Sequence, residues 1–363
     1  MSTAGATADL RPLLAANPYA PADLIAELGL AEPAELRAAA ATNLSAGQDL
    51  LAELAKDPDG VVRRCVAGNP CCQPGPLSSL AGDERWQIRM AVAANPAAPP
   101  DLLETLAGDA DKHVRAAVAG NPRCPRPVLA ELATEPDSRV RYCILQSTEA
   151  TPEALASVYD REDFMSRLFL ARNPAAPVAR LEELAGDPET PIRLALARNR
   201  LAPPMLLNRL AKDAYEMVAT TALRHPVAPQ HLVVAAAGGP DQALRRAAAS
   251  NPSCPPVPLN ALAADPARAV RRAASGNPSL PEAAAFLLAG DDDPAVRTAL
   301  GGNRSIPSPA LAALASDAAA PVRHRVAFNH AAGPALLSLL AQDGEPAVRA
   351  GVARHPAAGE MCP

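Results

Sequence analysis

A strict period of 26 residues runs through the chain and limits its fold more than any other feature. Each period is marked by an anchor residue, usually Asn followed by Pro, and no insertion or deletion breaks the register. The fourteen anchors are Asn17, Asn43, Asn69, Asn95, Asn121, Ser147, Asn173, Asn199, His225, Asn251, Asn277, Asn303, Asn329 and His355. A fixed period of about 20 to 50 residues is typical of solenoids, in which each unit packs on its neighbours.

The residues between two anchors predict two short helices. Leu recurs eight and eleven residues after the anchor, as in Leu103 and Leu106, which gives one apolar stripe on a first helix. Pro stands four residues after most anchors, where it suits the first turn of that helix. The second helix reads V-R-x-A-V-A and ends at the next anchor, because the residue before Pro disfavours helical geometry.

Two recurring polar residues are expected to form the turns: the Asp fourteen residues after the anchor, and the anchor Asn itself. Asp stands fourteen residues after the anchor in nine of thirteen units, as in Asp57-Pro58. We predict that this Asp caps the second helix and that the following Pro begins it. Asn tolerates left-handed backbone geometry, and its amide can bond the loop backbone on both sides.

We therefore predict an all-α solenoid of about thirteen two-helix repeats without a β-sheet, its shorter helices in α or 3₁₀ form. The unbroken period favours one domain over residues 1–363. It comprises a half repeat at 1–16, repeats at 17–354 and a partial repeat at 355–363. Neither end has a strongly polar cap, which allows end-to-end self-association.

The repeat resembles the leucine-rich repeat variant family. Copies such as NPAAPPDLLETLAGDADKHVRAAVAG at 95–120 and NPAAPVARLEELAGDPETPIRLALAR at 173–198 carry this resemblance, which covers roughly residues 10–356. It implies a right-handed superhelix of alternating α- and 3₁₀-helices, similar in style to HEAT-like repeats, and no particular reaction. One member of the family carries an iron–sulfur cluster on a cysteine-rich N-terminal segment. Here the first cysteine is Cys65, inside the repeats, so the cluster is not expected.

Composition disfavours several classes of protein. The formal net charge of −5 is unlike the basic balance of a general nucleic-acid binder. The N-terminal residues show no secretory signal, and no apolar run reaches the roughly 20 residues that span a bilayer. Seven cysteines without a regular pairing pattern fit a reducing compartment, so we expect a cytoplasmic protein that does not enter membranes.

An arginine column stands twenty residues after the anchor. Its members are Arg11, Arg37, Arg63, Arg89, Arg115, Arg141, Arg167, Arg193, Arg245, Arg271, Arg297, Arg323 and Arg349. The column could be a basic stripe for phosphate. We favour an internal ladder, in which each guanidinium bonds an Asp, a turn carbonyl or an Asn amide of a neighbouring repeat. The ladder residues are the anchors Asn69, Asn95, Asn121, Asn173, Asn199, Asn251, Asn277 and Asn303, with Arg63, Arg89, Arg115, Arg193, Arg271 and Arg297.

No residue pattern indicates catalysis, a metal or a cofactor. The spacing of Cys65, Cys71 and Cys72 is not that of a zinc or cluster site. Cys72, Cys124 and Cys254 stand where Ala is common, so they are interpreted as small buried residues. The six histidines form no H-x-x-x-H pair, and no nucleophile or phosphate-loop motif is present. We therefore predict that the protein is not an enzyme and has no cofactor.

The repeat at 147–172 departs most from the pattern, because it lacks the Asn anchor and has Arg161 in place of Asp. Aromatic residues gather around this repeat. An arginine is the last residue of this repeat and of each of the next two. These candidate binding residues are Tyr142, Tyr159, Phe164, Phe169, Arg172, Arg198 and Arg224. The aromatic residues either refill a repacked core or form an exposed anchor patch for a partner. The repeat at 225–250 is also degenerate, and whether either departure is functional or drift stays open.

We interpret the chain as a non-enzymatic scaffold for protein–protein interaction. Its expected partner is a protein, acidic or phosphorylated in character, that binds at Tyr142 to Arg224. The alternative is a helical-repeat protein that binds nucleic acid through an arginine stripe, which the net acidity of the chain disfavours.

Overall fold

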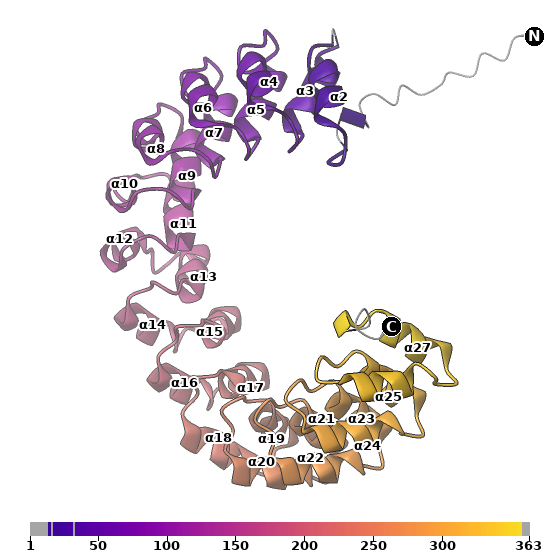
Figure 1. Ribbon diagram of the computed structural model, residues 1–363. Coiled ribbons are helices and arrows are strands. Elements are labelled where there is room, and N and C mark those ends of the chain that lie inside the picture. Colours follow the sequence, from indigo (N-terminus) through magenta and orange to yellow (C-terminus); the bar gives the residue numbers. More distant parts are fainter. Residues whose placement is uncertain (1–13, 16, 32, 358–363) are drawn as a thin grey trace, which may run out of the picture. The chain divides into compact units, whose positions relative to one another are not determined.

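The computed structural model describes residues 14–15, 17–31 and 33–357. Within these residues the chain forms 26 α-helices, α2 to α27, and no β-strand (Figure 1). The predicted all-α repeat fold is therefore confirmed. Most of the predicted half repeat at 1–16, including Arg11, and the last residues of the partial repeat at 355–363 lie outside the described residues.

Every described repeat consists of a first helix with an even number and a second helix with an odd number. The first helices are α2 (Ala22–Gly29), α4 (Gln48–Leu54), α6 (Pro74–Leu80), α8 (Pro100–Ala107), α10 (Arg126–Leu132), α12 (Pro152–Val158), α14 (Val178–Leu184), α16 (Pro204–Leu210), α18 (Gln230–Ala237), α20 (Pro256–Ala263), α22 (Glu282–Ala289), α24 (Ser308–Ala315) and α26 (Pro334–Leu340). Of the two forms that we considered for the shorter helix, the α form is the one present.

The second helices carry the V-R-x-A-V-A pattern. They are α3 (Ala34–Thr42), α5 (Gly60–Gly68), α7 (Trp86–Ala94), α9 (Lys112–Gly120), α11 (Ser138–Gln146), α13 (Phe164–Arg172), α15 (Thr190–Ala197), α17 (Glu216–Arg224), α19 (Gln242–Ala249), α21 (Arg268–Ser275), α23 (Pro294–Gly301), α25 (Ala320–Ala327) and α27 (Pro346–Ala353).

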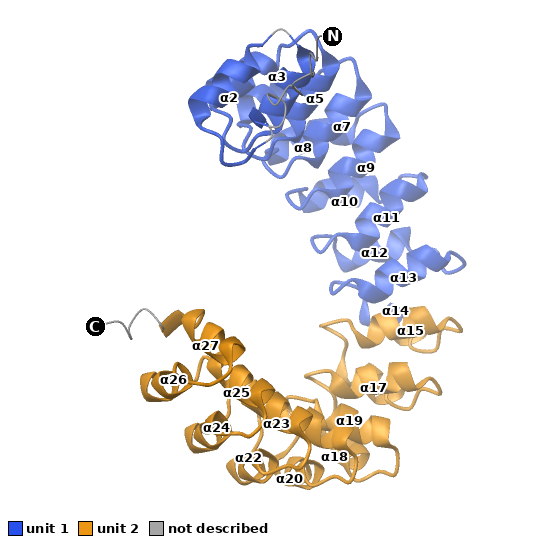
Figure 2. Cartoon of the chain, turned by 90° about the vertical axis from the view of Figure 1, so that its right-hand side faces the viewer, with its two compact units in different colours: residues 1–180 blue, residues 181–363 orange. Residues whose placement is uncertain are grey.

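The chain divides into two compact units, unit 1 at residues 1–180 and unit 2 at residues 181–363 (Figure 2). The boundary falls within α14. In each unit, second helices of successive repeats pack side by side in one layer, and the first helices form a second layer beside it.

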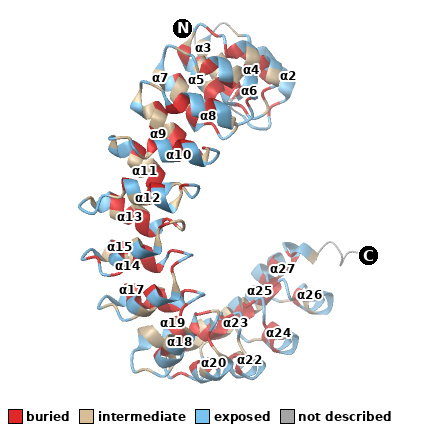
Figure 3. Cartoon of the chain, turned by 90° about the vertical axis from the view of Figure 1, so that its left-hand side faces the viewer, coloured by how far each residue is buried: buried red, intermediate tan, exposed pale blue. Residues whose placement is uncertain are grey.

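The core lies between the two layers and between successive repeats (Figure 3). In the repeat of α8 and α9, the buried side chains include Leu103 and Leu106 from the first helix and Val114 and Val118 from the second. Spacings of three and four place each pair on one face of its helix. Helices of eight and nine residues are only marginally stable alone, so packing on neighbouring repeats must hold them.

The second helix begins later than we predicted. In α5 the helix starts at Gly60, and Asp59 rather than Asp57 accepts the capping hydrogen bond, from the N–H of Val61 at 2.7 Å. Pro58 therefore precedes the helix instead of beginning it. The prediction was wrong because the sequence has two Asp residues two positions apart, and Asp57 is engaged by a partner from another repeat.

Two further local expectations also fail. The Pro four residues after the anchor is the N-cap of the first helix and not part of its first turn, as at Pro99 before α8. No described residue other than glycine has a positive φ, so the anchors do not use left-handed geometry. Asn121, with φ −75° and ψ 128°, is extended. The tight turn after each helix is therefore built from side-chain hydrogen bonds rather than from an unusual backbone conformation.

Candidate functional site

The arginine column binds the aspartate column of the following repeat. Arg89 donates from Nε to Oδ2 of Asp109 at 2.6 Å and from Nη2 to Oδ1 at 2.9 Å. Its Nη1 donates to the backbone oxygen of Asp83 at 2.7 Å. The same pairing occurs at Arg37–Asp57, Arg63–Asp83, Arg193–Asp213, Arg245–Asp265, Arg271–Asp291, Arg297–Asp317 and Arg323–Asp343.

Asp109 shows how the ladder lowers the pKa of a carboxyl group. Asp109 also accepts the N–H of Asp111 at 2.8 Å, and its side chain is only 7% exposed. The hydrogen bond from Arg89 outweighs the opposing effect of burial and lowers the pKa of Asp109. A carboxylate that is buried, ionised and fully engaged in this way is poorly suited to acid–base chemistry or to binding a metal ion.

The two columns change together where the pairing is lost. Ala219 replaces the arginine of one repeat, and the residue twenty positions later, in the place of the aspartate partner, is Gly239. Because both members of the ion pair are absent, no buried charge is left without a partner. Removing only one member would leave such a charge, which is costly.

The ladder is weakest in the repeats before and within 147–172. Arg115 meets Glu135 instead of Asp, with a single bond from Nη2 to Oε2 at 2.9 Å, and its Nε is buried without a hydrogen-bond partner. Twenty positions after Arg141 stands Arg161, which offers no carboxylate. Arg141 instead donates to the backbone oxygen of Pro136 at 2.7 Å.

The Asn anchors also join neighbouring repeats. Asn121 Nδ2 donates to the backbone oxygens of Ala93, in the last turn of α7, at 2.7 Å and of the preceding anchor Asn95 at 2.9 Å, and its Oδ1 accepts the N–H of Arg123 at 2.9 Å. The same two donor bonds occur at Asn43, Asn69, Asn95, Asn173, Asn251, Asn277, Asn303 and Asn329. Each anchor is thus a buried amide that ties two loops together.

The anchors that are not Asn keep part of this set. His225 Nε2 lies 3.1 Å from the backbone oxygen of Asn199, and its Nδ1 accepts the N–H of Val227 at 3.3 Å. His355 repeats both contacts at its own anchor position. Ser147 retains only the bond within its loop, where its Oγ accepts the N–H of Glu149 at 3.3 Å.

The four candidate aromatic residues do not form one patch. Tyr142 and Phe169 pack edge to face, with ring centroids 5.6 Å apart, and both are half-buried. The hydrogen bond to Asp163 raises the pKa of the Tyr142 hydroxyl. Tyr159 lies instead under the guanidinium of Arg180, 5.4 Å from its ring centroid. Phe164 is exposed on the first turn of α13.

The three candidate arginines share one place in the repeat. Arg172 and Arg224 are the last residues of α13 and α17, and Arg198 is the C-cap of α15. All three are exposed. Arg172 belongs to unit 1, whereas Arg198 and Arg224 belong to unit 2.

The structure adds exposed arginines that sequence reasoning missed. Each follows a ladder arginine by one or two positions on a second helix, and its side chain turns away from the ladder. They are Arg64, Arg246, Arg272 and Arg325. Three of them could have been found from the pairs of adjacent arginines at 63–64, 245–246 and 271–272. In each pair the first guanidinium belongs to the ladder and the second is exposed.

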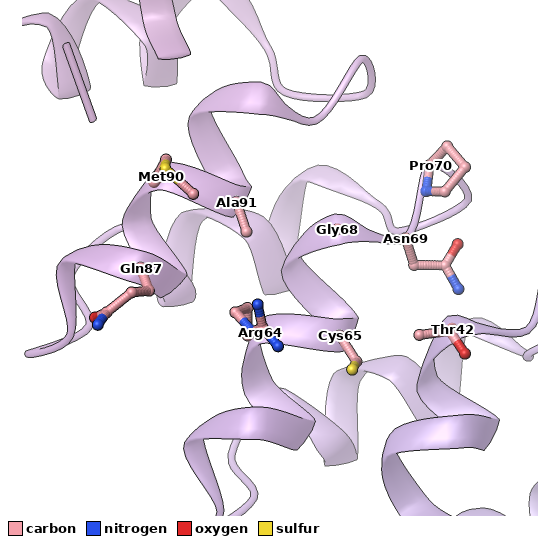
Figure 4. Close-up of a pocket in the computed structure, with 9 residues that line it drawn as sticks. All are labelled: Thr42, Arg64, Cys65, Gly68, Asn69, Pro70, Gln87, Met90 and Ala91. Carbon is pink, nitrogen blue, oxygen red and sulfur yellow. The ribbon is translucent and has the colours of Figure 1, made fainter. Parts of the chain in front are cut away.

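Arg64 borders a groove of about 310 Å³ in unit 1 (Figure 4). The groove lies along α5 and α7, and its lining includes Cys65, Gly68, Gln87 and Met90. It has one cation and no carboxylate among its lining residues. The second-helix layer is therefore hollowed as well as basic.

None of the six cysteines that the structure describes belongs to a group of three or more metal-binding side chains. Cys72, Cys124 and Cys254 are buried, and burial raises the pKa of each thiol to about 11. Thiols with so high a pKa are poor nucleophiles and poor metal ligands at neutral pH. Among residues 14–15, 17–31 and 33–357, no three His, Cys, Asp or Glu side chains gather in a way that could hold a metal ion.

Helix length bears on membrane insertion. The part of the chain that the structure describes contains no helix long and apolar enough to cross a membrane.

Two family models match the chain. The leucine-rich repeat variant domain matches residues 76–122, and the leucine-rich repeat variant matches residues 166–189. Both matched segments lie within the 26-residue repeats, which continue on either side of them. No curated protein matches the chain.

Several solved structures are similar. One, described as a leucine-rich repeat variant with a novel repetitive structural motif, is 24% identical over 61% of this chain and 88% of that chain, with a TM-score of 0.41. A structure of importin beta is 14% identical over 91% of this chain and 49% of that chain, with a TM-score of 0.27.

Proposed function

We propose that the chain is a leucine-rich repeat variant protein that acts as a non-enzymatic scaffold and binds other proteins along the exposed faces of its second helices. A repeat solenoid provides a long surface, and variation at exposed positions of each repeat provides selectivity.

A separation of charge between the two helix layers carries this proposal. Within the described second helices the only carboxylates are Glu35 and Glu216. The acidic side chains of the helices lie mainly on first helices, such as Asp101 and Glu104 of α8. Because Asp engages most of the ladder arginines, the charge that the second helices present to solvent comes mainly from the other arginines. A one-sided positive surface of this kind favours an acidic partner.

The segment from Tyr142 to Arg224 remains our proposal for one contact region, with an acidic or phosphorylated protein as partner. The exposure of Phe164 and Arg172 supports it, since aromatic residues and arginines are enriched in interface hot spots. The mutual packing of Tyr142 and Phe169 supports the repacked core instead. We further propose one continuous repeat domain in the cytoplasm, with self-association through its ends.

Nucleic acid is the second candidate, because exposed arginines on successive helices could follow a phosphate backbone. The net charge of −5 weighs against it. A salt titration separates the two candidates: binding to nucleic acid should weaken steeply and linearly in log salt, by roughly one unit of slope for each phosphate contact.

Recovery of a stoichiometric partner by cross-linking and affinity purification tests the scaffold. The variant Arg172→Glu, Arg198→Glu, Arg224→Glu should lose that partner. A control that reverses the exposed charges Arg200, Lys212 and Arg304 should retain it. Retention by the first variant together with loss by the control would place the site elsewhere. Failure to recover any protein partner, with turnover of a small molecule instead, would reject the scaffold.

A further inference from the structure

A second groove lies on the second-helix layer of unit 2. It has a volume of about 760 Å³ and runs over α21, α23 and α25, which pack side by side. Arg272 of α21 and Arg325 of α25 stand on either side of α23. The lining between them is mostly of small residues: Gly276, Ala295, Thr298, Ala299 and Gly302.

Gly302 allows the guanidinium of Arg325 to lie directly against the backbone at the edge of the groove. A Cβ built there would lie 2.4 Å from Nε of Arg325, so any larger residue would displace the guanidinium. Thr298 leaves the floor largely apolar, because its hydroxyl donates to the backbone oxygen of Pro294 at 2.7 Å. The floor can therefore accept a close-lying backbone beside the guanidinium of Arg325.

The charged residues that line the groove are all positive. Its lining residues include no carboxylate. Asp293, which directly precedes the lining residue Pro294, accepts the N–H of Ala295 at 2.8 Å and pairs with Arg268 at 3.5 Å. Asp291 and Asp317 are taken by the ladder arginines Arg271 and Arg297. Within the described residues, no ion pair engages Arg272 or Arg325, and both are exposed.

The positive surface continues toward α17 and α19. Arg224 and Arg246 are exposed, and they lack ion-pair partners in the described part of the chain. Burial and the charge of Arg246 lower the pKa of Arg224, which indicates two guanidinium groups close enough to repel each other. A like-charged pair without a counter-ion gains from a bound anion.

We propose that this groove binds an extended acidic segment of a partner protein, with one carboxylate at Arg272 and another at Arg325. The inference rests on the proposed scaffold function and adds the site and the chemistry of the partner. The two arginines stand two repeats apart, about 20 Å at usual helix spacings, and an extended chain rises about 3.3 Å per residue. The matching segment therefore carries acidic residues about six positions apart, with small residues between them.

The observations favour a peptide over nucleic acid. No aromatic side chain lines the groove, and recognition of single strands depends on stacking of bases on such side chains. The apolar floor of alanines and glycines suits a polypeptide backbone and small side chains better than it suits a sugar–phosphate chain.

The probe is a fluorescein-labelled peptide of Gly, Ser and Ala with two Glu residues about six positions apart, followed by fluorescence anisotropy with the full chain. The double variant Arg272→Glu, Arg325→Glu should bind the peptide about tenfold more weakly or worse. The control Arg209→Glu, Lys212→Glu makes the same change of charge beside a first helix and should bind as the parent does. Circular dichroism establishes that both variants fold. Gly302→Val is a second test, expected to weaken binding through displacement of Arg325.

Four outcomes would overturn the inference: no binding of the peptide at low salt, equal weakening by both double variants, equal binding of a peptide with adjacent Glu residues, or tighter binding of a single-stranded oligonucleotide through the same arginines. A protein partner that the chain still captures after Arg272→Glu, Arg325→Glu would leave the scaffold standing and remove only this site from it.

Discussion

Arg89 donates two hydrogen bonds, of 2.6 and 2.9 Å, to Asp109 across the boundary between two repeats. The same guanidinium reaches back to the Asp83 carbonyl at 2.7 Å. One side chain therefore joins the turn of its own repeat to the turn of the next. Because each turn is held partly by a neighbour, adjacent repeats should unfold together.

The variant Arg89→Ala should lower the free energy of unfolding by about 2 kcal/mol, since Asp109 would remain buried without its partner. A double-mutant cycle with Asp109→Ala, measured by urea denaturation, should show a coupling of about 1 kcal/mol or more. Additive effects of the two substitutions would mean that the pair contributes nothing of its own.

The lost pair at Ala219 and Gly239 can be restored. Ala219→Arg together with Gly239→Asp should stabilise unit 2 relative to either single change, because each single change introduces a charge without its partner. A Cβ at Gly239 would lie 3.4 Å from the backbone oxygens of Ala235 and Ala236, which is tight but tolerable. Thermal melts of the four proteins provide the comparison. A double variant no more stable than the more stable single variant would contradict pairing between repeats.

The anchor amide can be both removed and restored. Asn121→Ala deprives two backbone oxygens and one N–H of a buried partner and should cost about 1 to 3 kcal/mol. Ser147 has φ −71° and ψ 127°, nearly the backbone of Asn121, so Ser147→Asn can form the missing bonds and should stabilise by about 1 kcal/mol. If Ser147→Asn lowers the melting temperature, the degenerate repeat has repacked beyond simple repair.

Acid should weaken the ladder in a defined range. The hydrogen bond from Arg323 outweighs burial and lowers the pKa of Asp343 to about 2. Since the pKa is lower in the folded state, the stabilisation is complete above the unfolded value of about 4 and is lost as the pH falls toward 2. Melting temperatures measured from pH 5 to 2 should fall steadily. Asp343→Asn should be less stable at pH 5 and should show a shallower fall.

His225 should contribute at higher pH. Burial lowers the pKa of its imidazole below its ordinary value of about 6.5. The neutral ring is favoured in the folded state, so stability is complete above about pH 6.5 and declines as the pH falls through the folded pKa. His225→Asn should remove this decline, whereas the exposed His231→Asn should not. Identical pH profiles for the parent and His225→Asn would show that His225 titrates normally.

The repeat architecture could be predicted from the sequence because its determinants are local. A 26-residue register, Leu at spacings of three and Val at spacings of four specify short amphipathic helices that cannot exist alone. Only stacking of the repeats buries these stripes, so an all-α repeat fold follows from the pattern itself. The prediction that the cysteines at 72, 124 and 254 replace buried alanines depends on the same register.

The tertiary structure decided which polar groups meet. Asp57 and Asp59 are equal candidates for the N-cap in sequence, and only the approach of Arg37 from the preceding repeat assigns them different roles. Likewise, Arg271 and Arg272 are neighbours in the chain, but the stacking of α21 on its neighbours buries one guanidinium against Asp291 and leaves the other over the groove. Local sequence sets the rotation of each helix about its own axis. The offset between one repeat and the next arises only when the repeats pack, and it determines which side chains lie within hydrogen-bonding distance.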